Sequence, residues 1–451
     1  MKAQGLLIVL LIVLITMMTM MTAVCCLAAP PAAAALEEVT VSIDRTRTEM
    51  VSHLSLGITH TQTGLDRGGD PDAILRGRRA FASVSRYQNV HIMGWGTDNP
   101  NPAPSVYNWE SLDRRMAMVR SLKGAVPVIT LCAAPDWMKG GEPGKTDWSR
   151  IEAAAVPERY ADFAALAAVI ARRYPDVRYF QVWNEFKGFW NAPKNNWNYE
   201  NYTRMYNMVY DALKAVRRDI QVGGPYLVVE GTGSERGDWS TEKPIRARQW
   251  EVLDYWLKNK KGADFICLDR GVKTFHDKSR YTPAETMRLI HYFGDVAKQI
   301  RARTDLPIWW AEFYGGIEGG DAQSVAAVHA SILYHMLRGG SSVALLWNGI
   351  ADGEVGHGLI TDIRKPAGGQ PTPHYLVFEA FHKHFGPSTS LYRSTSSSPD
   401  IEVLASAKKT LLINKRAVPV AVRLENKEVI LAAYDVRLLD TPTVTEKKSK
   451  R

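Results

Sequence analysis

Residues 179–185 read YFQVWNE, an apolar run that ends in the polar pair Asn184 and Glu185. Residues 306–312 read LPIWWAE and have the same form, since they end in Glu312. Short continuous apolar runs are typical of parallel strands that helices cover on both faces. The two segments therefore predict a parallel sheet with a carboxylate at the carboxyl end of two of its strands.

Eight strand-like runs of this kind alternate with longer segments of helical periodicity between residues 54 and 347. Eight parallel strands fit a closed (β/α)8 barrel better than an open sheet. The doubly wound sheet remains the structural alternative, but no glycine-rich phosphate loop follows the first strand. The expected strands are Leu54–Thr59, Val90–Met93, Val126–Cys132, Val177–Trp183, Ile220–Gly224, Phe265–Leu268, Ile308–Ala311 and Val343–Trp347. The expected helices include Asp72–Tyr87, Glu158–Tyr174, Glu200–Arg218, Arg246–Lys260, Pro283–Arg303 and Ala322–Arg338.

A different pattern follows Pro387, where a Ser- and Thr-rich stretch over residues 389–399 precedes short alternating runs from Ile401 to Leu439. Alternation of this kind predicts a small antiparallel β-sandwich-like module. We therefore expect a barrel over residues 36–388, a module over residues 389–442 and a basic tail over residues 443–451. An early strand over residues 38–44 is a candidate to join the module.

The first 35 residues contain an export signal. Lys2 precedes an apolar run from Leu6 to Ala29, and small residues follow from Ala32 to Ala35. This order predicts a signal peptide, although the run is long enough that an uncleaved membrane anchor is the alternative. The expected location is secreted or extracytoplasmic, with a possible membrane tether.

The composition of the 451 residues narrows the function classes. An apolar fraction of 45% excludes a wholly disordered chain. The net charge is +9, but the basic residues are scattered except at the tail, so no nucleic-acid partner is expected. Cys132 and Cys267 are expected on separate strands without a disulfide. No cofactor or metal is expected, because the histidines show no ligand spacing.

Two carboxylates at strand ends suit the cleavage of a glycosidic bond. One carboxyl must deliver a proton to the leaving oxygen, and a carboxylate must stabilise or attack the anomeric carbon. Enzymes that retain configuration place the two groups about 5–5.5 Å apart. We expect Glu185 to be the acid/base and Glu312 the nucleophile, and Asn184 to hydrogen-bond the sugar 2-hydroxyl.

The wider text resembles glycoside hydrolase family 39, the β-xylosidase and α-L-iduronidase family, which belongs to a clan of retaining (β/α)8 barrels. The resemblance rests on HIMGWG at residues 91–96, APDWM at 134–138, QVWNE at 181–185 and WAE at 310–312. It covers most of residues 53–385. It implies a barrel with an attached β-module, a retaining double displacement and no metal.

One segment departs from the pattern of the clan. Many members have His-x-Tyr at the end of strand six, where the Tyr supports the nucleophile, but residues 267–271 here read CLDRG. Either a later residue such as His276 or Tyr281 takes this role, or the subsite differs. Arg270 either recognises an acidic sugar in a bidentate contact or pairs with a nearby loop carboxylate.

Six further residues are candidates for sugar binding, each with a packing role as the alternative. Indole rings can stack on a sugar ring, and imidazole or carboxylate groups can bind its hydroxyls. The candidates are Asp136, Trp137, Trp347, Trp95, His60 and His91.

The sequence thus predicts a retaining glycosidase that acts on a polysaccharide or oligosaccharide, β-xyloside-like or related, through a covalent glycosyl-enzyme. One alternative is a non-catalytic carbohydrate-binding barrel protein of the cell envelope, which the altered strand-six segment favours. Another is an envelope scaffold protein, in which replacing Glu185 changes nothing measurable.

Overall fold

The computed structural model describes residues 36–230, 243–272, 281–315, 320–351 and 358–441. The chain divides into two compact units, Met1–Glu38 and Val39–Arg451, and the account below concerns the second unit. The predicted export segment and basic tail lie outside the described residues. Within the described ranges, no helix combines the length and the apolar character that a membrane crossing requires.

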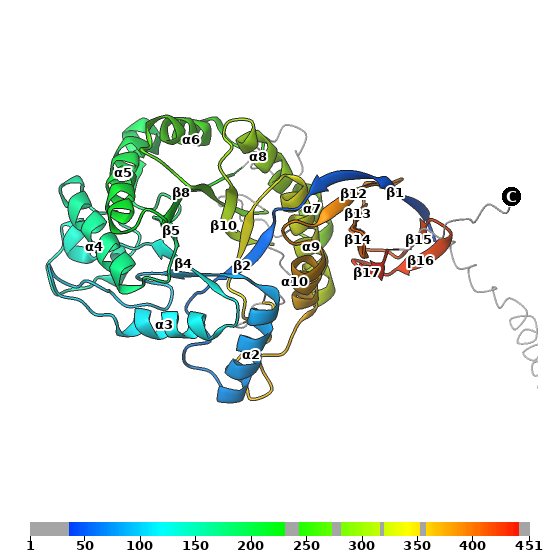
Figure 1. Ribbon diagram of the computed structural model, residues 1–451, viewed down its shortest axis with the longest axis horizontal. Coiled ribbons are helices and arrows are strands. Elements are labelled where there is room, and N and C mark those ends of the chain that lie inside the picture. The colour runs from blue at the N-terminus through cyan, green and yellow to red at the C-terminus, as the bar shows by residue number, and fades with distance from the viewer. Residues whose placement is uncertain (1–35, 231–242, 273–280, 316–319, 352–357, 442–451) are drawn as a thin grey trace, which may run out of the picture. The chain divides into compact units, whose positions relative to one another are not determined.

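Eight parallel strands close into a barrel in the order β10, β11, β2, β3, β4, β5, β8 and β9 (Figure 1). Their bounds are β2 Ser55–Thr59, β3 Tyr87–His91, β4 Val126–Leu131, β5 Tyr179–Val182, β8 Gln221–Val228, β9 Phe265–Gly271, β10 Ile308–Tyr314 and β11 Val343–Trp347. Nearly every strand residue is buried, because the barrel interior fills one face and helices cover the other. The predicted fold class is confirmed.

Helices surround the barrel and connect its strands (Figure 1). They are α2 Pro71–Val84, α3 Glu110–Ser121, α4 Tyr160–Arg173, α5 Tyr199–Val216, α6 Ala247–Asn259, α7 Pro283–Leu289, α8 Tyr292–Arg301, α9 Ala322–Arg338 and α10 Pro373–His384. Several helices begin at a capping residue that their sequences contain. Asp70, Thr282 and Thr372 each cap the first backbone N–H groups and precede a proline, which needs no donor in the first turn.

Short elements lie in the connections between strands. The loop after β4 contains the 3-10 turns η1 Asp136–Lys139, η2 Trp148–Arg150 and η3 Pro157–Arg159. The loop after β5 contains a small hairpin of β6 Trp190–Asn191 and β7 Asn196–Trp197, with η4 Ala192–Lys194 between them.

Several expected boundaries were wrong. The helix expected over residues 72–87 ends at Val84, and Tyr87 instead begins β3, where its ring packs against Tyr179 and Trp309 inside the barrel. The single helix expected over residues 283–303 is two helices, α7 and α8. Two helices, α3 and α10, were not among those expected. Tertiary packing overrides local periodicity at these positions.

The barrel interior has an apolar part and a polar part. Phe265 stacks on Trp309 with ring centroids 4.1 Å apart, within a cluster of buried side chains from several strands. A chain of hydrogen bonds joins Thr59 to Asn89 at 3.1 Å, Asn89 to Thr130 at 2.9 Å and Thr130 to Gln181 at 3.0 Å. Its members are fully buried and come from four neighbouring strands, so they fix the register of the strands that carry the site.

Antiparallel sheets form the C-terminal module. One has the order β12 Ser390–Ser396, β1 Glu38–Val51, β15 Val420–Leu424 and β16 Lys427–Leu431. The other has the order β13 Ile401–Ala405, β14 Lys409–Asn414 and β17 Val436–Asp440. The N-terminal strand therefore pairs inside this module, with β12 as a partner. The Ser- and Thr-rich stretch holds β12, although the first strand was expected only at Ile401.

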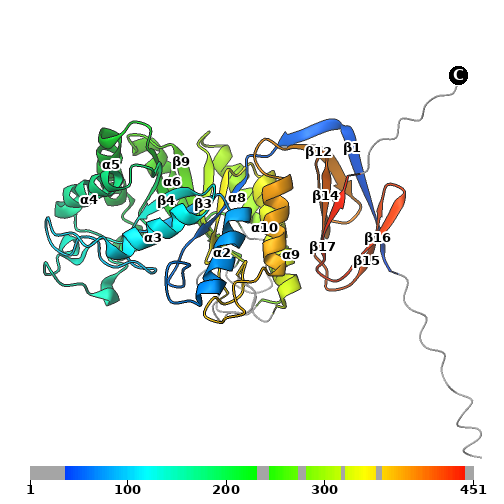
Figure 2. The ribbon, with the colours of Figure 1, turned by 60° about the horizontal axis from the view of Figure 1, so that its bottom comes forward.

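The module packs on the last helices of the barrel. Figure 2 shows β14 and β17 beside α9 and α10, and α9 contacts β13, β14 and β17. His335 Nε2 lies 2.9 Å from Oε1 of Glu402, which is buried, and Arg338 pairs with Glu49. Cys132 and Cys267 are buried free thiols.

Candidate active site

Three carboxyl groups meet at the carboxyl ends of the barrel strands. Glu185 follows β5, Asp269 lies in β9 and Glu312 lies in β10, and one oxygen of each lies within 4.8 Å of the others. The Asp269 side chain is fully buried and Glu312 is nearly so, whereas 17% of the Glu185 side chain is exposed. The structure therefore brings both predicted catalytic carboxyls together and adds Asp269, which the sequence analysis treated only as part of an altered segment.

The backbone of the turn after β5 has an unusual conformation that positions Glu185. Trp183 and Glu185 have positive φ angles of 70° and 51°, which bulky residues rarely adopt. The buried Trp183 indole donates a hydrogen bond to the Lys187 carbonyl at 2.8 Å and holds this turn. Trp95, Tyr226 and Asn348, near other strand ends, also have positive φ. Strained backbone of this kind collects at functional sites.

A β-bulge turns Glu312 toward Asp269. The register between β9 and β10 shifts after Trp310, and beyond the shift Glu312 pairs directly with Asp269. Glu312 was expected at a strand end, but β10 continues to Tyr314. Because residues paired across two strands project to the same face, the bulge sets two acidic side chains next to each other.

Lys187 supplies positive charge at Glu185. Its Nζ lies 2.9 Å from Glu185 Oε2 and 2.9 Å from Glu152 Oε1. The same ammonium lies over the Trp95 ring, 5.1 Å from its centroid. The sequence analysis missed Lys187, although its position two residues after Glu185 in the same turn was a signal that could have identified it.

Tyr226 supports Glu312. The phenol of this buried residue in β8 donates a hydrogen bond to Glu312 Oε2 at 3.2 Å. His276, one residue considered for the supporting role, lies outside the described residues. Tyr281, the other, packs in the main hydrophobic core. A tyrosine thus does contact the expected nucleophile, but it comes from the strand before the one on which the clan pattern places it.

The environment gives the three carboxyls different proton affinities. Burial raises the pKa of Asp269 well above its ordinary value, and the neighbouring Glu312 and Glu185 raise it further. Burial and Glu185 likewise raise the pKa of Glu312. Burial also acts to raise the pKa of Glu185, but the neighbouring Asp269 carboxyl and the charge of Lys187 outweigh it and lower that pKa. In the resting site the protons therefore favour Asp269 and Glu312, whereas the expected roles require the catalytic proton on Glu185.

Four other predicted residues lie beside the carboxyls. Asn184 Nδ2 is 3.5 Å from His91 Nε2, and among the described residues Asn184 Oδ1 has no hydrogen-bond partner. The ring centroids of His91 and Trp95 are 4.5 Å apart, and those of Trp95 and Trp347 are 6.4 Å apart. Burial lowers the pKa of His91 to about 3, so this imidazole is neutral. Two indoles, an amide and a neutral imidazole next to the turn that carries Glu185 are groups that bind a sugar ring.

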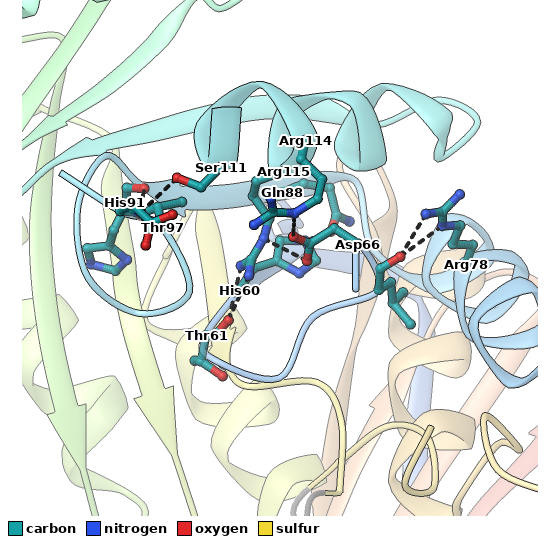
Figure 3. A network of polar contacts seen from close by, with 12 residues as sticks. His60, Thr61, Asp66, Arg78, Gln88, His91, Thr97, Ser111, Arg114 and Arg115 are labelled. Carbon is teal, nitrogen blue, oxygen red and sulfur yellow. Dashed lines mark hydrogen bonds and ion pairs between the residues drawn. The ribbon is translucent and has the colours of Figure 1, made fainter. Parts of the chain in front are cut away.

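Two of the remaining predicted sugar-binding residues, His60 and Trp137, form hydrogen bonds within the protein. His60 Nε2 bonds Gln88 Oε1 at 2.9 Å within the buried network of Figure 3. Trp137 donates from its indole to the Asn101 carbonyl at 2.9 Å. Asp136 lies in η1 and is buried, and no contact between its carboxylate and the three carboxyls is found in the described parts. Sugar binding by His60, Asp136 and Trp137 stays a prediction.

Arg270 is directed away from the carboxyls. Its Nη1 donates to the carbonyl oxygens of Val229 at 3.0 Å and Pro244 at 3.2 Å, and the guanidinium lies over the ring of Tyr292. Successive residues of a strand project to opposite faces, so Asp269 facing the interior requires Arg270 to face the helices. This arrangement does not support recognition of an acidic sugar by Arg270.

The three carboxyls are also close enough to share a cation. Three oxygen donors are fewer than the six to eight that Ca²⁺ prefers, and the Lys187 ammonium already neutralises Glu185. The donor set therefore fits proton-transfer chemistry better than a resident metal.

Several solved structures with this arrangement of elements are glycoside hydrolases. The chain is similar to a monomeric β-xylosidase from Caulobacter crescentus CB15, with 16% identity, a TM-score of 0.56 and coverage of 90% of this chain and 97% of that one. It is similar to a family 39 enzyme from Xanthomonas axonopodis pv. citri, with 18% identity, a TM-score of 0.54 and coverage of 90% and 79%. A bacterial orthologue of human α-L-iduronidase matches with 15% identity, a TM-score of 0.57 and coverage of 86% and 68%. The chain therefore has a family 39-like fold. No family model and no curated protein sequence matches it.

Proposed function

We propose that the protein is a retaining glycoside hydrolase that cleaves O-glycosidic bonds of a polysaccharide or oligosaccharide, such as a β-xyloside. One observation carries the proposal: Glu185 and Glu312, from strands far apart in the sequence, have carboxyl oxygens within 4.8 Å of each other. This separation suits the roughly 5–5.5 Å spacing of retaining enzymes and is shorter than the roughly 6.5–9.5 Å of inverting ones. The family 39-like fold supports the same conclusion. We also propose export of the protein, because of its N-terminal apolar segment.

In the proposed reaction, Glu312 attacks the anomeric carbon while the leaving oxygen takes a proton from Glu185. The glycosyl–Glu312 ester is then hydrolysed by a water molecule whose proton returns to Glu185. Tyr226 orients the attacking carboxylate, and Lys187 favours the ionised form of Glu185 that the second step requires. Asn184 Oδ1 is available to accept a hydrogen bond from a sugar hydroxyl.

Glu185→Ala is expected to slow hydrolysis in proportion to the difficulty of the leaving group. With an alkyl or sugar leaving group, loss of the general acid should lower kcat by about 10²-fold. With a dinitrophenolate, which departs without a proton, the first step should be nearly unaffected. The test is a panel of aryl and alkyl glycosides and neutral and acidic polysaccharides, assayed with parent and variant. Equal losses of kcat/KM, which reports on the first step, for all leaving groups would argue against the acid role. Binding without turnover would favour a carbohydrate-binding protein.

Lys187→Met is expected to move the alkaline limb of the kcat/KM profile to higher pH. Without the ammonium, ionised Glu185 is less stable and the carboxyl keeps its proton to a higher pH, so the general acid stays active there. Lys194→Met is the control, since Lys194 in η4 pairs with Glu200 at an exposed position. A shift of the Lys187→Met limb to lower pH, or equal shifts in both variants, would contradict this account.

A further inference from the structure

Asp269 has surroundings that suit a neutral acid better than a carboxylate. Its side chain is fully buried, and no N–H or O–H group of the described residues donates to either oxygen. Its register partner is another acid, Glu312. A buried carboxylate without donors is strongly disfavoured, and like charges opposite each other add to the cost.

An oxygen of Asp269 lies within 4.8 Å of one of Glu185, and two buried carboxylates this close repel each other unless one of them holds a proton. Of the three carboxyls, Glu185 alone has an ammonium, that of Lys187, at 2.9 Å. Glu312 has the Tyr226 hydroxyl, which stabilises an anion less than a cation does. The contacts therefore give one anion, on Glu185, and two neutral acids.

We propose that Asp269 is a neutral carboxylic acid that positions a proton for Glu185 and passes it on when Glu312 gives up its own. The inference rests on the proposed glycosidase function and deepens it. It explains how a resting site with its protons on Asp269 and Glu312 becomes the reactive site with a protonated Glu185.

The transfer conserves protons and charge. The O–H bond of Asp269 breaks as its proton bonds to Glu185, and the O–H bond of Glu312 breaks as its proton bonds to Asp269. Afterwards Glu185 is a neutral acid, Glu312 is an anion ready to attack, and Asp269 is neutral again. A sugar ring that carries a developing positive charge next to Glu312 favours this arrangement.

The groups that face Asp269 come from the strands and the turn around it. They are Glu185 and Lys187 after β5, Tyr226 of β8, and Glu312 and Tyr314 of β10. The pKa of Tyr314 is raised chiefly by the charge that Asp269 would carry, and burial raises it further. Both tyrosines therefore stay neutral, and the proton exchange involves only the three carboxyls.

Infrared spectroscopy of the full-length protein at pH 7 tests the resting state. The carbonyl band of a protonated carboxyl is separate from the carboxylate bands, and Asp269 and Glu312 are the acids with a raised pKa among the described residues. Asp269→Asn should remove one acid band and Glu312→Gln the other. Glu402→Gln is the matched control, because Glu402 is buried but its contacts with His335 and Lys415 lower its pKa. Folded Asp269→Asn that keeps both acid bands of the parent would overturn the proposal.

Thermal unfolding gives a second readout that does not depend on activity. A raised pKa in the folded state means that stability falls as pH rises above the unfolded pKa, because the folded state must then hold a proton that the unfolded chain releases. Asp269→Asn has no carboxyl at this position, so it does not lose stability in this way. The Tm of the variant minus the Tm of the parent should therefore rise from pH 4 to pH 7. A Tm difference that falls over this range would overturn the proposal. If Asp269→Asn does not fold, Glu312→Gln must still show the acid band of Asp269. Absence of an acid band in Glu312→Gln would also overturn the proposal.

Leaving-group dependence tests the transfer. Asp269→Asn can neither pass a proton to Glu185 nor take one from Glu312, so Glu312 stays protonated. The value of kcat/KM should fall about 10²-fold with an alkyl leaving group, and it should also fall with a dinitrophenolate, for which Glu185→Ala leaves the first step nearly unaffected. Asp269→Glu, which keeps the acid, should recover part of the loss. Unchanged kcat/KM with the alkyl glycoside would overturn the transfer. If the parent cleaves no glycoside while Asp269→Asn loses its acid band, the neutral Asp269 stands and the glycosidase proposal fails.

Discussion

Glu312→Ala is expected to lower kcat/KM for an aryl glycoside by roughly 10⁴-fold or more, the largest effect of any single replacement in this protein. The methyl group cannot attack the anomeric carbon, and both steps of a double displacement pass through the missing carboxylate. Unlike the loss of Glu185, this loss should not depend on the leaving group. The measurement is the initial rate of hydrolysis by parent and variant on the same panel of glycosides.

Azide distinguishes a lost nucleophile from a disturbed site. In the cavity left by Glu312→Ala, azide can attack the anomeric carbon directly and give a glycosyl azide of inverted configuration. Glu379→Ala, on the outer helix α10 where Glu379 pairs with Lys383, is the control and should keep the parent rate. An azide product of retained configuration would assign Glu312 to the acid/base role instead. If Glu312→Ala kept activity within tenfold of the parent, Glu312 would have no catalytic role.

The barrel could be predicted because each strand is encoded locally. A run such as residues 179–182 is apolar throughout, and its burial on both faces in the structure is what that composition requires. The two glutamates could be predicted for the same reason, since each follows a local run. The runs do not encode how far each strand extends along its neighbour. For this reason β9 was expected to end at Leu268, but it continues through Asp269.

The rest of the site depends on pairing between segments far apart in the chain. Asp269 meets Glu312 only because a bulge shifts the register of β10 against β9, and one sequence does not reveal that shift. Tyr226 reaches Glu312 from β8, so a search for the tyrosine near strand six did not find it. His60 and Trp137 were expected in the site because they follow strand ends, and both make contacts that hold loops.

The loops beside the site depend on one buried ion pair (Figure 3). Arg115 of α3 lies with its Nε 2.9 Å from Asp66 Oδ1, and both side chains are almost completely buried. Its Nη1 and Nη2 each donate to the Thr61 carbonyl at 3.0 Å, which fixes the loop after β2. Gly96 in the loop after β3 has φ of 101°, and a Cβ there would come within 2.3 Å of Arg115 Nη2. The guanidinium therefore packs directly under the loop that carries Trp95.

Arg115→Met is expected to lower the free energy of unfolding by about 3–5 kcal/mol, because it leaves the Asp66 carboxylate buried with only a partial counter-charge from Arg114. Methionine keeps much of the aliphatic volume, so the loss reports mainly on charge and hydrogen bonding. The control on the same helix is Arg120→Met, whose exposed pair with Asp176 should contribute only about 0–1 kcal/mol. Urea unfolding followed by circular dichroism measures both. Equal losses would mean that the buried pair does not stabilise these loops, and that Trp95 is held against His91 by aromatic packing alone.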